Sequence, residues 1–232
     1  MMTAKEVKFV RSLRNRKSRL EHGLFVVEGE KMVNEALASG FKLRSVYRKS
    51  EIGEKQMAQI SAMSSPSPAL AVVEIPAATV PQRPFEGLSI ALDSVRDPGN
   101  LGTIIRLADW FGVKAVYASP DTVEMYNPKV IQASMGSIFR VKLIYCPLEE
   151  KIEEFKAAGA EVYGTFLAGK NLYETSPAKD ALIVFGNEAN GVSYSVMQHI
   201  SNRITIPSFG SSAESLNVAA AAAIVISECK RR

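Results

Sequence analysis

The chain of 232 residues has few of the side chains that hold metals or form disulfides, and it has no long apolar run. It contains two cysteines, Cys146 and Cys229, and two histidines, His22 and His199. Two cysteines are too few for a disulfide framework, and two histidines give no metal-ligand cluster. No apolar run approaches the roughly 18 residues of a membrane-spanning helix, and the N-terminus lacks the apolar core of a secretory signal. We therefore expect a cytoplasmic protein with no metal and no membrane partner.

Three common signatures of nucleotide and hydrolase chemistry are also missing. The sequence has no G-x-G-x-x-G, no G-x-x-x-x-G-K-[ST] and no G-x-S-x-G. Each of these loops holds a phosphate group or a nucleophile in its enzyme class. Their absence argues against an ordinary Rossmann enzyme, a P-loop NTPase and an α/β-hydrolase.

The charge that is present is concentrated at the N-terminus. Residues 1–23 carry seven Lys or Arg against two Glu, a net charge of +5, while the remaining residues sum to −1. Val7, Val10 and Leu13 recur at helical spacing, which predicts a helix with one apolar edge. A basic arm on a near-neutral body is typical of binding to an anionic polymer. A solvated helix face is the alternative.

The first 76 residues have the pattern of a small α/β domain. The pattern predicts strands at 23–29, 42–49 and 69–75, a helix at 30–40 and a loop at 64–68. In the helix, Met32, Val33, Ala36 and Leu37 are expected to face inward, with Gly40 as C-cap. The stretch 76–87 contains three prolines and no periodicity. We expect domain 1–76 to end in a linker at 77–87.

The second part, residues 88–232, alternates strands and helices. It predicts strands at 88–95, 114–119, 140–146, 161–167, 181–186 and 203–207, with helices at 103–112, 127–139, 148–159 and from 218 onward. This alternation favours an α/β fold with a largely parallel sheet covered on both faces. In such sheets, ligands bind where strands end and helices begin.

Polar or glycine-rich junctions of that kind occur at 93–106, 185–193 and 206–217. In the first, Asn100 is expected to be the N-cap of the following helix. Arg106 lies on the polar side of that helix, where a structural pair with Asp109 is the simple alternative to a function.

The other two junctions also have simple structural readings. A tight turn alone would explain the glycines that flank Glu188. In the third junction, Ser211 and Glu214 could form a capping box, or Ser215 or Asn217 could cap instead. The alanines that follow allow a helix to lie very close to other backbone or to a second subunit, although alanine is also simply a strong helix former.

Taken together and in order, these segments resemble the SpoU/TrmH ribose methyltransferases of the SPOUT superfamily. The resemblance is carried by four C-terminal segments: DPGNLGTIIRLA, NPKVIQASMG, VFGNEANGVS and IPSFGSSAESLNVAAAAAI. The front, RKSRLEHGLFVVEGEKMVNEAL, is similar to the substrate-binding domain of many members, which has a ribosomal-protein-like α/β fold. Small departures occur at Leu107, Ala189 and Ser208, where Thr, Gly and Met are common.

The resemblance implies a deep trefoil knot in the C-terminal SPOUT domain and a homodimer. It implies S-adenosylmethionine as cofactor and methylation of a ribose 2′-hydroxyl in RNA, with ribosomal RNA favoured over transfer RNA. The residues that it marks as catalytic are Asn100, Arg106, Ser215 and Asn217. Those that it marks as cofactor-binding are Gly186, Glu188, Ile206 and Leu216. The basic arm would bind RNA phosphates through Lys8, Arg11, Arg14, Arg16, Lys17 and Arg19.

Two other functions remain open at this point. The chain could be a non-catalytic RNA-binding or assembly protein that keeps the fold, or another α/β enzyme such as a nucleotide-dependent transferase. Within the methyltransferase reading, Arg106 could act as the base or could bind a phosphate. Because a guanidinium has a pKa above about 12, we favour phosphate binding.

Overall fold

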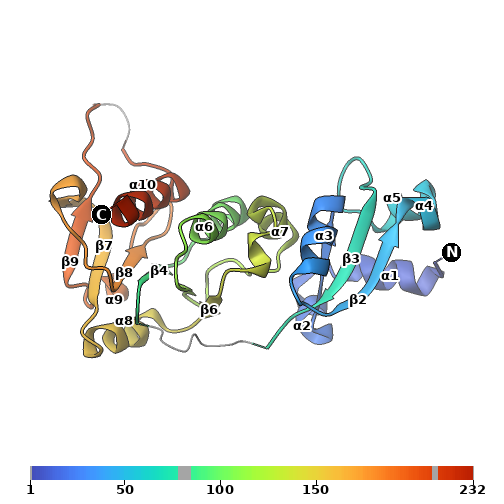
Figure 1. Cartoon of the computed structure of the whole chain (residues 1–232), viewed down its shortest axis with the longest axis horizontal. Helices are drawn as coiled ribbons and strands as arrows, with labels where there is room; N and C mark the ends of the chain where they lie inside the picture. Colours follow the sequence, from blue (N-terminus) through green and yellow to red (C-terminus); the bar gives the residue numbers. More distant parts are fainter. Residues whose placement is uncertain (1, 78–84, 211–213, 232) are drawn as a thin grey trace. The chain divides into compact units, whose positions relative to one another are not determined.

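The computed structural model describes residues 2–77, 85–210 and 214–231 (Figure 1). The chain forms two compact units, each with its own sheet. Unit 1 is 1–77 together with 124–140, and unit 2 is 78–123 together with 141–232. Most of the predicted linker, 78–84, lies outside the described residues.

Unit 1 is built on a three-stranded antiparallel sheet in the order β1-β3-β2. The strands are β1 (Leu24–Glu28), β2 (Leu43–Arg48) and β3 (Ala69–Glu74). The helices of this unit are α1 (Ala4–Ser12), α2 (Arg16–His22), α3 (Glu30–Ala38), α4 (Lys49–Ile52), α5 (Glu54–Ile60) and α7 (Pro128–Ser134), followed by the single turn η1 (Ser137–Phe139). The three predicted strands and the helix after the first are confirmed.

The basic arm forms two helices, α1 and α2, rather than one. Asn15 interrupts the pattern because its side chain accepts a hydrogen bond from the Lys17 N–H and so starts a new helix. Val10 and Leu13 are buried as predicted, against α5 and the sheet. The apolar edge of the arm is therefore fixed to the core, and six of its seven cations, all except Arg19, remain exposed.

In α3 the buried stripe is narrower than predicted. Met32, Val33 and Ala36 are buried, but Leu37 is 54% exposed, so its inward placement is wrong. The C-cap is Ser39 rather than Gly40, and Gly40 follows it with a φ of +78°. Gly40 still supplies the left-handed conformation that ends the helix, but it lies just after the cap, so the helix ends one residue earlier than predicted.

The segment 124–140 is joined to the rest of unit 1 by a buried ion pair. Arg19 donates from Nε to Glu124 Oε2 at 3.1 Å and from Nη1 to the backbone carbonyls of Leu13 and Arg14 at 3.0 and 2.7 Å. Its side chain is only 3% exposed. Arg19 is therefore not available to RNA, contrary to the prediction, because its donors already satisfy buried acceptors.

Aromatic rings add to this packing. The Phe25 ring lies 4.5 Å from that of Tyr126, and the Phe41 ring lies 5.1 Å from that of Phe139. The sequence pattern treated 127–139 only as a helix of the second part. In the structure its aromatic and apolar side chains complete the core of unit 1.

Unit 2 contains a six-stranded sheet in the order β6-β5-β4-β8-β7-β9, and every strand pair is parallel. Its strands are β4 (Leu88–Leu92), β5 (Val116–Ala118), β6 (Leu143–Tyr145), β7 (Glu161–Asn171), β8 (Ala181–Phe185) and β9 (Asn202–Thr205). Its helices are α6 (Pro98–Trp110), α8 (Leu148–Ala157), α9 (Tyr194–Met197) and α10 (Val218–Arg231), with the short turn η2 (Leu172–Glu174). The predicted α/β fold with a parallel sheet is confirmed.

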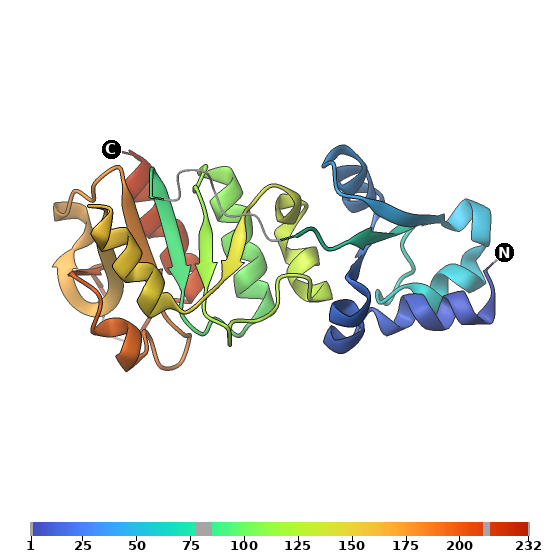
Figure 2. The same cartoon turned by 90° about the horizontal axis from the view of Figure 1, so that it is seen from below.

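Helices cover both faces of this sheet (Figures 1 and 2). Ile152 and Phe155 of α8 and Val196 of α9 share one apolar cluster with alternate residues of the strands. On the other face, α6 packs against α10. No helix in the described ranges is long and apolar enough to span a bilayer. The predicted knot, whose last loop includes residues 211–213 outside the described ranges, stays a prediction.

Strand order creates a switch point between β4 and β8. From β4 the chain moves through α6 to β5 at one side, whereas from β8 it moves through α9 to β9 beyond β7 on the other side. Loops that leave neighbouring parallel strands in opposite directions leave a crevice at the carboxyl edge. The fold therefore places the first two polar junctions at this crevice.

We predict that Glu124→Ala lowers the free energy of unfolding by about 3–5 kcal/mol, because it leaves the buried Arg19 charge without its partner. The double variant Arg19→Met, Glu124→Leu should lose less, since no buried charge remains. Chemical denaturation followed by circular dichroism measures both. A loss below about 1 kcal/mol for Glu124→Ala would contradict this role of the pair.

Candidate active site

The three polar junctions of the sequence meet at the side chain of Asn100. Its Nδ2 donates to Glu188 Oε1 at 2.9 Å, and its Oδ1 accepts from Asn217 Nδ2 at 2.9 Å. These residues are 88 and 117 positions apart from Asn100 in the chain. A single amide thus joins the loop after β4, the loop after β8 and the start of α10.

Asn100 can do this because it is not the N-cap of α6. The N-cap is Asp97, whose carboxylate accepts from the Asn100 N–H at 2.8 Å, and the helix begins with Pro98. The predicted capping role of Asn100 is therefore wrong. Its backbone is capped by Asp97, and its side chain is left to bridge the neighbouring segments.

Glu188 lies at the tip of the loop after β8 and at the N-terminus of α6. Besides the Asn100 amide, its carboxylate receives the Asp97 N–H at 3.4 Å and the Asn187 amide at 3.3 Å. A carboxylate is favoured here because the N-terminus of a helix carries a partial positive charge. The Glu188 loop is therefore tied to α6 by charge as well as by hydrogen bonds.

Asn217 is the cap of α10. Its Oδ1 accepts from the Ala219 and Ala220 N–H groups at 2.9 and 3.3 Å. This confirms Asn217 among the caps considered for this helix, while Ser211 of the possible capping box lies outside the described residues. The amide has a second role, since its Nδ2 reaches Asn100. The small buried side chains Ala219 and Ala222 let α10 pack against α6.

Gly186 is required by the tightness of the turn that carries Glu188. A Cβ on Gly186 would lie 2.2 Å from the backbone of both Gly191 and Val192. Asn187 and Gly191 exchange two backbone hydrogen bonds of 2.8 and 2.9 Å, and Gly191 has a φ of +67°. Close backbone approach explains Gly186, and the left-handed backbone conformation explains Gly191, so a tight turn accounts for both glycines.

A polar hub centred on Ser94 holds the loops after three adjacent strands, β5, β4 and β8. Ser94 has a φ of +58°, which is rare for a residue with a side chain. Its N–H donates to Ser119 Oγ at 2.8 Å, its carbonyl accepts from Asn187 Nδ2 at 2.7 Å, and its hydroxyl donates to Asp121. Its hydrogen bonds hold it in a conformation that would otherwise be unfavourable.

The buried carboxylate of Asp93, beside Ser94, adds a further link. It accepts from the Ser193 N–H at 2.6 Å and so fixes the far end of the Glu188 loop. Sequence reasoning missed Asp93 and Ser94 as site-building residues. The only signal was their place directly after a buried strand.

The pKa of the Asp121 carboxyl is lowered, first by the hydrogen bond from the Ser94 hydroxyl and then by that from Ser119. The exposed Arg96 guanidinium, 3.4 Å from Asp121, acts in the same direction. Asp121 is therefore a charged acceptor at neutral pH, which is the form that the Ser94 hydroxyl stabilises.

Comparison with known proteins agrees with this architecture. Residues 87–227 match the family model described as the SpoU rRNA Methylase family. The chain belongs to the SpoU rRNA methylase family. Residues 4–83 of this SpoU family member match the MRM3-like substrate binding domain.

Individual relatives resemble the whole chain of this SpoU protein. It is 34% identical to the 23S rRNA (guanosine(2553)-2′-O)-methyltransferase RlmP of Bacillus subtilis, over 95% of this chain and 94% of the relative. A solved TrmH-family structure from Porphyromonas gingivalis is 39% identical with a TM-score of 0.91, covering 100% and 99% of the two chains. The AdoMet-bound rRNA methyltransferase of Sinorhizobium meliloti is 31% identical with a TM-score of 0.88, covering 100% and 96%.

Not all of the predicted site residues join the Asn100 bridge. Arg106 and Ser215 are exposed, and neither contacts Asn100 in the bridge. Ile206 is half-buried, and Leu216, next to Asn217, is 50% exposed. Arg106 and Leu216 of this SpoU protein are therefore open to solvent.

The predicted RNA-binding side chains of unit 1 differ in availability. Lys8, Arg11, Arg16 and Lys17 are exposed. The Arg14 guanidinium donates to the Ile60 carbonyl at 3.0 Å and to that of Ser61, so it is partly engaged. A hollow of about 480 Å³ is lined by Lys8 and Arg11 together with Gln56 and Gln59.

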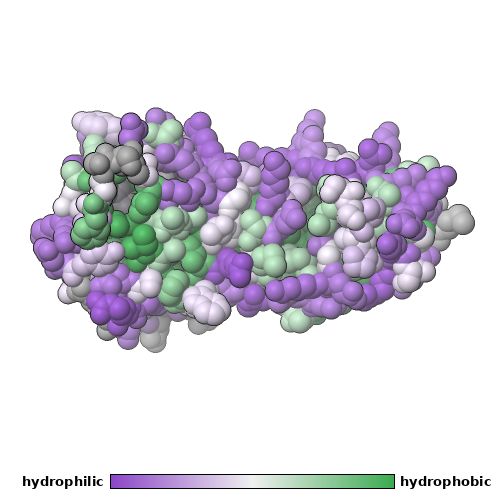
Figure 3. Space-filling view, turned by 90° about the horizontal axis from the view of Figure 1, so that it is seen from above, coloured by the Kyte–Doolittle hydropathy of each residue, from purple (hydrophilic) through white to green (hydrophobic). Residues whose placement is uncertain are grey.

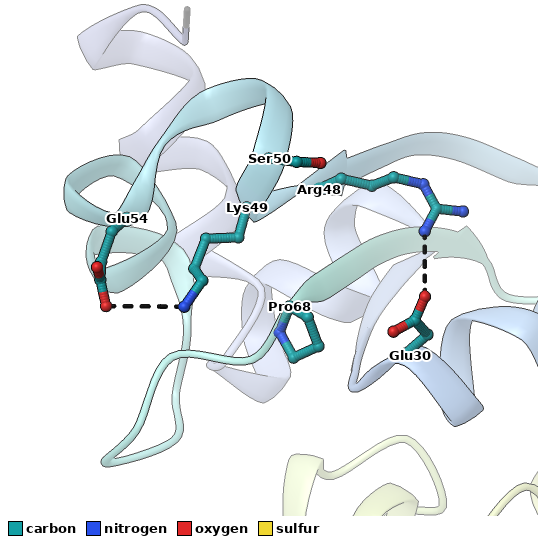
Figure 4. Close-up of a pocket in the computed structure, with 6 residues that line it drawn as sticks. All are labelled: Glu30, Arg48, Lys49, Ser50, Glu54 and Pro68. Atoms are coloured by element: carbon teal, nitrogen blue, oxygen red, sulfur yellow. Dashed lines mark ion pairs between the residues drawn. The ribbon is translucent and has the colours of Figure 1, made fainter.

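A second hollow of unit 1, about 490 Å³, contains none of the predicted site residues (Figure 4). Two ion pairs cross it: Arg48 lies 3.8 Å from Glu30, and Lys49 lies 3.7 Å from Glu54. Because each cation faces a carboxylate, this hollow offers no net charge to an anionic ligand. We assign it no function.

We predict that Ser94→Ala raises the pKa of the Asp121 carboxyl toward its ordinary value, because the largest cause of its depression is removed. A lowered folded-state pKa means that Asp121 contributes stability above its unfolded-state pKa, and that this contribution is lost as pH falls through the folded-state pKa. The variant should therefore lose the contribution at a higher pH. Carboxyl NMR titration measures the shift, with Ser39→Ala as control. An unchanged Asp121 titration would contradict the role of the Ser94 hydroxyl in the hub.

Proposed function

We propose that this protein transfers the methyl group of S-adenosylmethionine to a ribose 2′-hydroxyl of ribosomal RNA. The observation that carries the proposal is the bridge from Asn100 to Glu188 and Asn217 at the switch point of a parallel sheet. The family match and the 23S rRNA 2′-O-methyltransferase activity in the printed names of relatives support the chemistry and favour ribosomal RNA.

The residues at the carboxyl edge fit an adenosine-containing cofactor. Gly186 is buried beneath the tight turn that presents Glu188, Ile206 is a half-buried apolar residue after β9, and Leu216 offers exposed apolar area next to Asn217. Adenosine needs a combination of backbone hydrogen bonds and apolar contact. When bound, S-adenosylmethionine supplies a methyl group on a positively charged sulfur. Two solved relatives are named as AdoMet complexes.

The polar side chains then have separate tasks. Glu188 and Asn217 fix the two loops around the crevice, and Asn100 holds them together. Methyl transfer requires the attacking oxygen to be aligned and to lose its proton. A guanidinium is a planar cation with several donors, so Arg106 suits binding of the neighbouring phosphate and stabilisation of the developing negative oxygen. The proton then passes to the phosphate or to solvent, and exposed Ser215 helps order the loop.

The exposed cations of α1 and α2 form the proposed RNA-binding surface. Lys8, Arg11, Arg16 and Lys17 stay in this role, Arg14 contributes in part, and Arg19 does not. Binding through phosphates releases counterions and weakens as salt is added. The domain limits 1–76 and 88–232 and the cytoplasmic setting remain part of the proposal.

A homodimer also belongs to the proposal. Figure 3 shows hydrophobic side chains at the surface of unit 2, and the exposed large apolar residues of that unit include Trp110, Leu167 and Phe209. Phe209 is 93% exposed. Exposed apolar area of this kind is typical of a surface that a partner or ligand covers.

Two measurements test the function. Titration with S-adenosylmethionine should give a measurable heat of binding, and ribosomal RNA from cells without the protein should lack a 2′-O-methyl group that normal cells have. An absence of binding heat would favour the non-catalytic RNA-binding alternative. Loss of a methyl group from transfer RNA instead would contradict the assigned substrate.

We predict that Arg106→Lys lowers kcat by about tenfold or more while the affinity for S-adenosylmethionine is unchanged. Lysine keeps the charge but loses the planar pair of donors that matches a phosphate. Arg203→Lys, at an exposed site of the same unit, is the matched control and should be silent. Full activity of Arg106→Lys at neutral pH would show that the planar guanidinium is not needed.

A further inference from the structure

We infer that unit 1 carries a site for an unpaired RNA base, formed by Phe9, His22 and Arg44. This inference rests on the proposed RNA substrate and goes beyond phosphate binding by the basic arm. None of the three residues belongs to the predicted set. They come from α1, the end of α2 and β2, and the fold brings them together.

The geometry centres on the Phe9 ring. The Arg44 guanidinium carbon lies over this ring, 5.4 Å from its centroid. The His22 ring meets it edge to face, with centroids 5.1 Å apart and planes at 70°. Phe9 itself is half-buried and packs against the α1–α5 core, so the platform is anchored from below.

The outer parts of the cluster are open to solvent, since Arg44 and His22 are both exposed. A guanidinium held on an aromatic ring has lost much of its freedom and presents a flat, cationic surface. Unpaired RNA bases stack on such guanidinium and aromatic surfaces. The imidazole of His22 can donate or accept a hydrogen bond at the edge of the base. The three groups therefore match one flat base with polar edges.

Charge around the platform favours RNA over an apolar partner. Lys5 is exposed and lies one helical turn before Phe9, on the same side of α1. Lys8 and Arg11 add exposed cations on the same helix. Phosphates on either side of a stacked base would meet these cations. Duplex RNA does not fit, because its base faces are already stacked.

The simpler reading is that Arg44 only covers Phe9. The protein offers a comparison, because Arg203 lies over Phe166 at 5.0 Å in unit 2. That pair has the same chemistry but belongs to the other unit. Arg203→Lys therefore controls for the loss of a guanidinium from a phenyl ring as such.

The test is fluorescence anisotropy with a labelled single-stranded RNA 12-mer and the same sequence in a hairpin duplex, each at two salt concentrations. Arg44→Lys and Phe9→Leu should bind the single strand about fivefold or more weakly, with duplex affinity and salt slope unchanged. Lys8→Gln should instead reduce the salt slope for both RNAs. Arg203→Lys should bind both RNAs like the parent protein.

Thermal unfolding checks that each variant is folded. Because Arg44 is exposed, Arg44→Lys keeps the test valid if Phe9→Leu unfolds.

Parent-like binding of the single strand by Arg44→Lys would overturn the site. An equal loss on the duplex, or an equal loss in Arg203→Lys, would overturn it as well. These outcomes leave the proposed methyltransferase intact. If the parent protein bound neither RNA, the RNA substrate itself would be wrong and this inference would fall with it.

Discussion

The two hydrogen bonds of the Asn100 side chain are the interaction on which the candidate site depends. An amide carries donors on one atom and an acceptor on the other, so it can satisfy the Glu188 carboxylate and the Asn217 amide together. A carboxylate would repel Glu188, and an apolar side chain would remove both hydrogen bonds that link the three segments. The three loops form one crevice because this residue has both kinds of group.

The backbone beneath the bridge explains why the bridge is possible. Asp97 is the N-cap of α6, so the Asn100 side chain is not needed for capping and can form the bridge. Gly186 permits the tight turn that presents Glu188, and Asp93 and Ser94 hold the loops on either side of it. Parallel strands bring these segments to one edge, and hydrogen bonds then set their spacing. Reactive groups need this kind of support to stay aligned.

Apolar runs were enough to predict the strands, because strands such as β4 and β8 are buried along their whole length. Apolar residues at helical spacing predicted the longer helices, whereas the short helices α4, α5 and α9 were not predicted. The predictions that were wrong concern two kinds of residue. For some, two neighbouring residues carry nearly equal local signals, and for others the deciding partner is distant in sequence. Asp97 and Asn100 are both good N-caps, and Pro98 at the first helical position decides for Asp97. Arg19 counted as a surface charge because nothing near it in sequence reveals Glu124, 105 residues away. The Ser94 hub involves three separate loops, so no local pattern marks it.

Some residues of the candidate site could be predicted from the sequence, and others could not. The family motifs brought attention to Asn100, Glu188 and Asn217, and the structure joins them. Arg106 and Ser215 remain exposed, and their roles rest on chemistry with RNA that the chain alone does not display. In unit 1, the number of basic residues predicted phosphate binding. The Phe9 site could not be predicted in this way, because its residues come together only when α1, α2 and β2 are folded against one another.

A double-mutant cycle tests the central claim most directly. Asn100→Ala, Asn217→Ala and the double variant are titrated with S-adenosylmethionine by calorimetry. If one bridge organises the crevice, each single variant weakens binding and the double variant loses less than the sum of the two, because both single variants remove the hydrogen bond between Asn100 and Asn217. Losses that simply add would show that the two residues act separately, and would contradict the account.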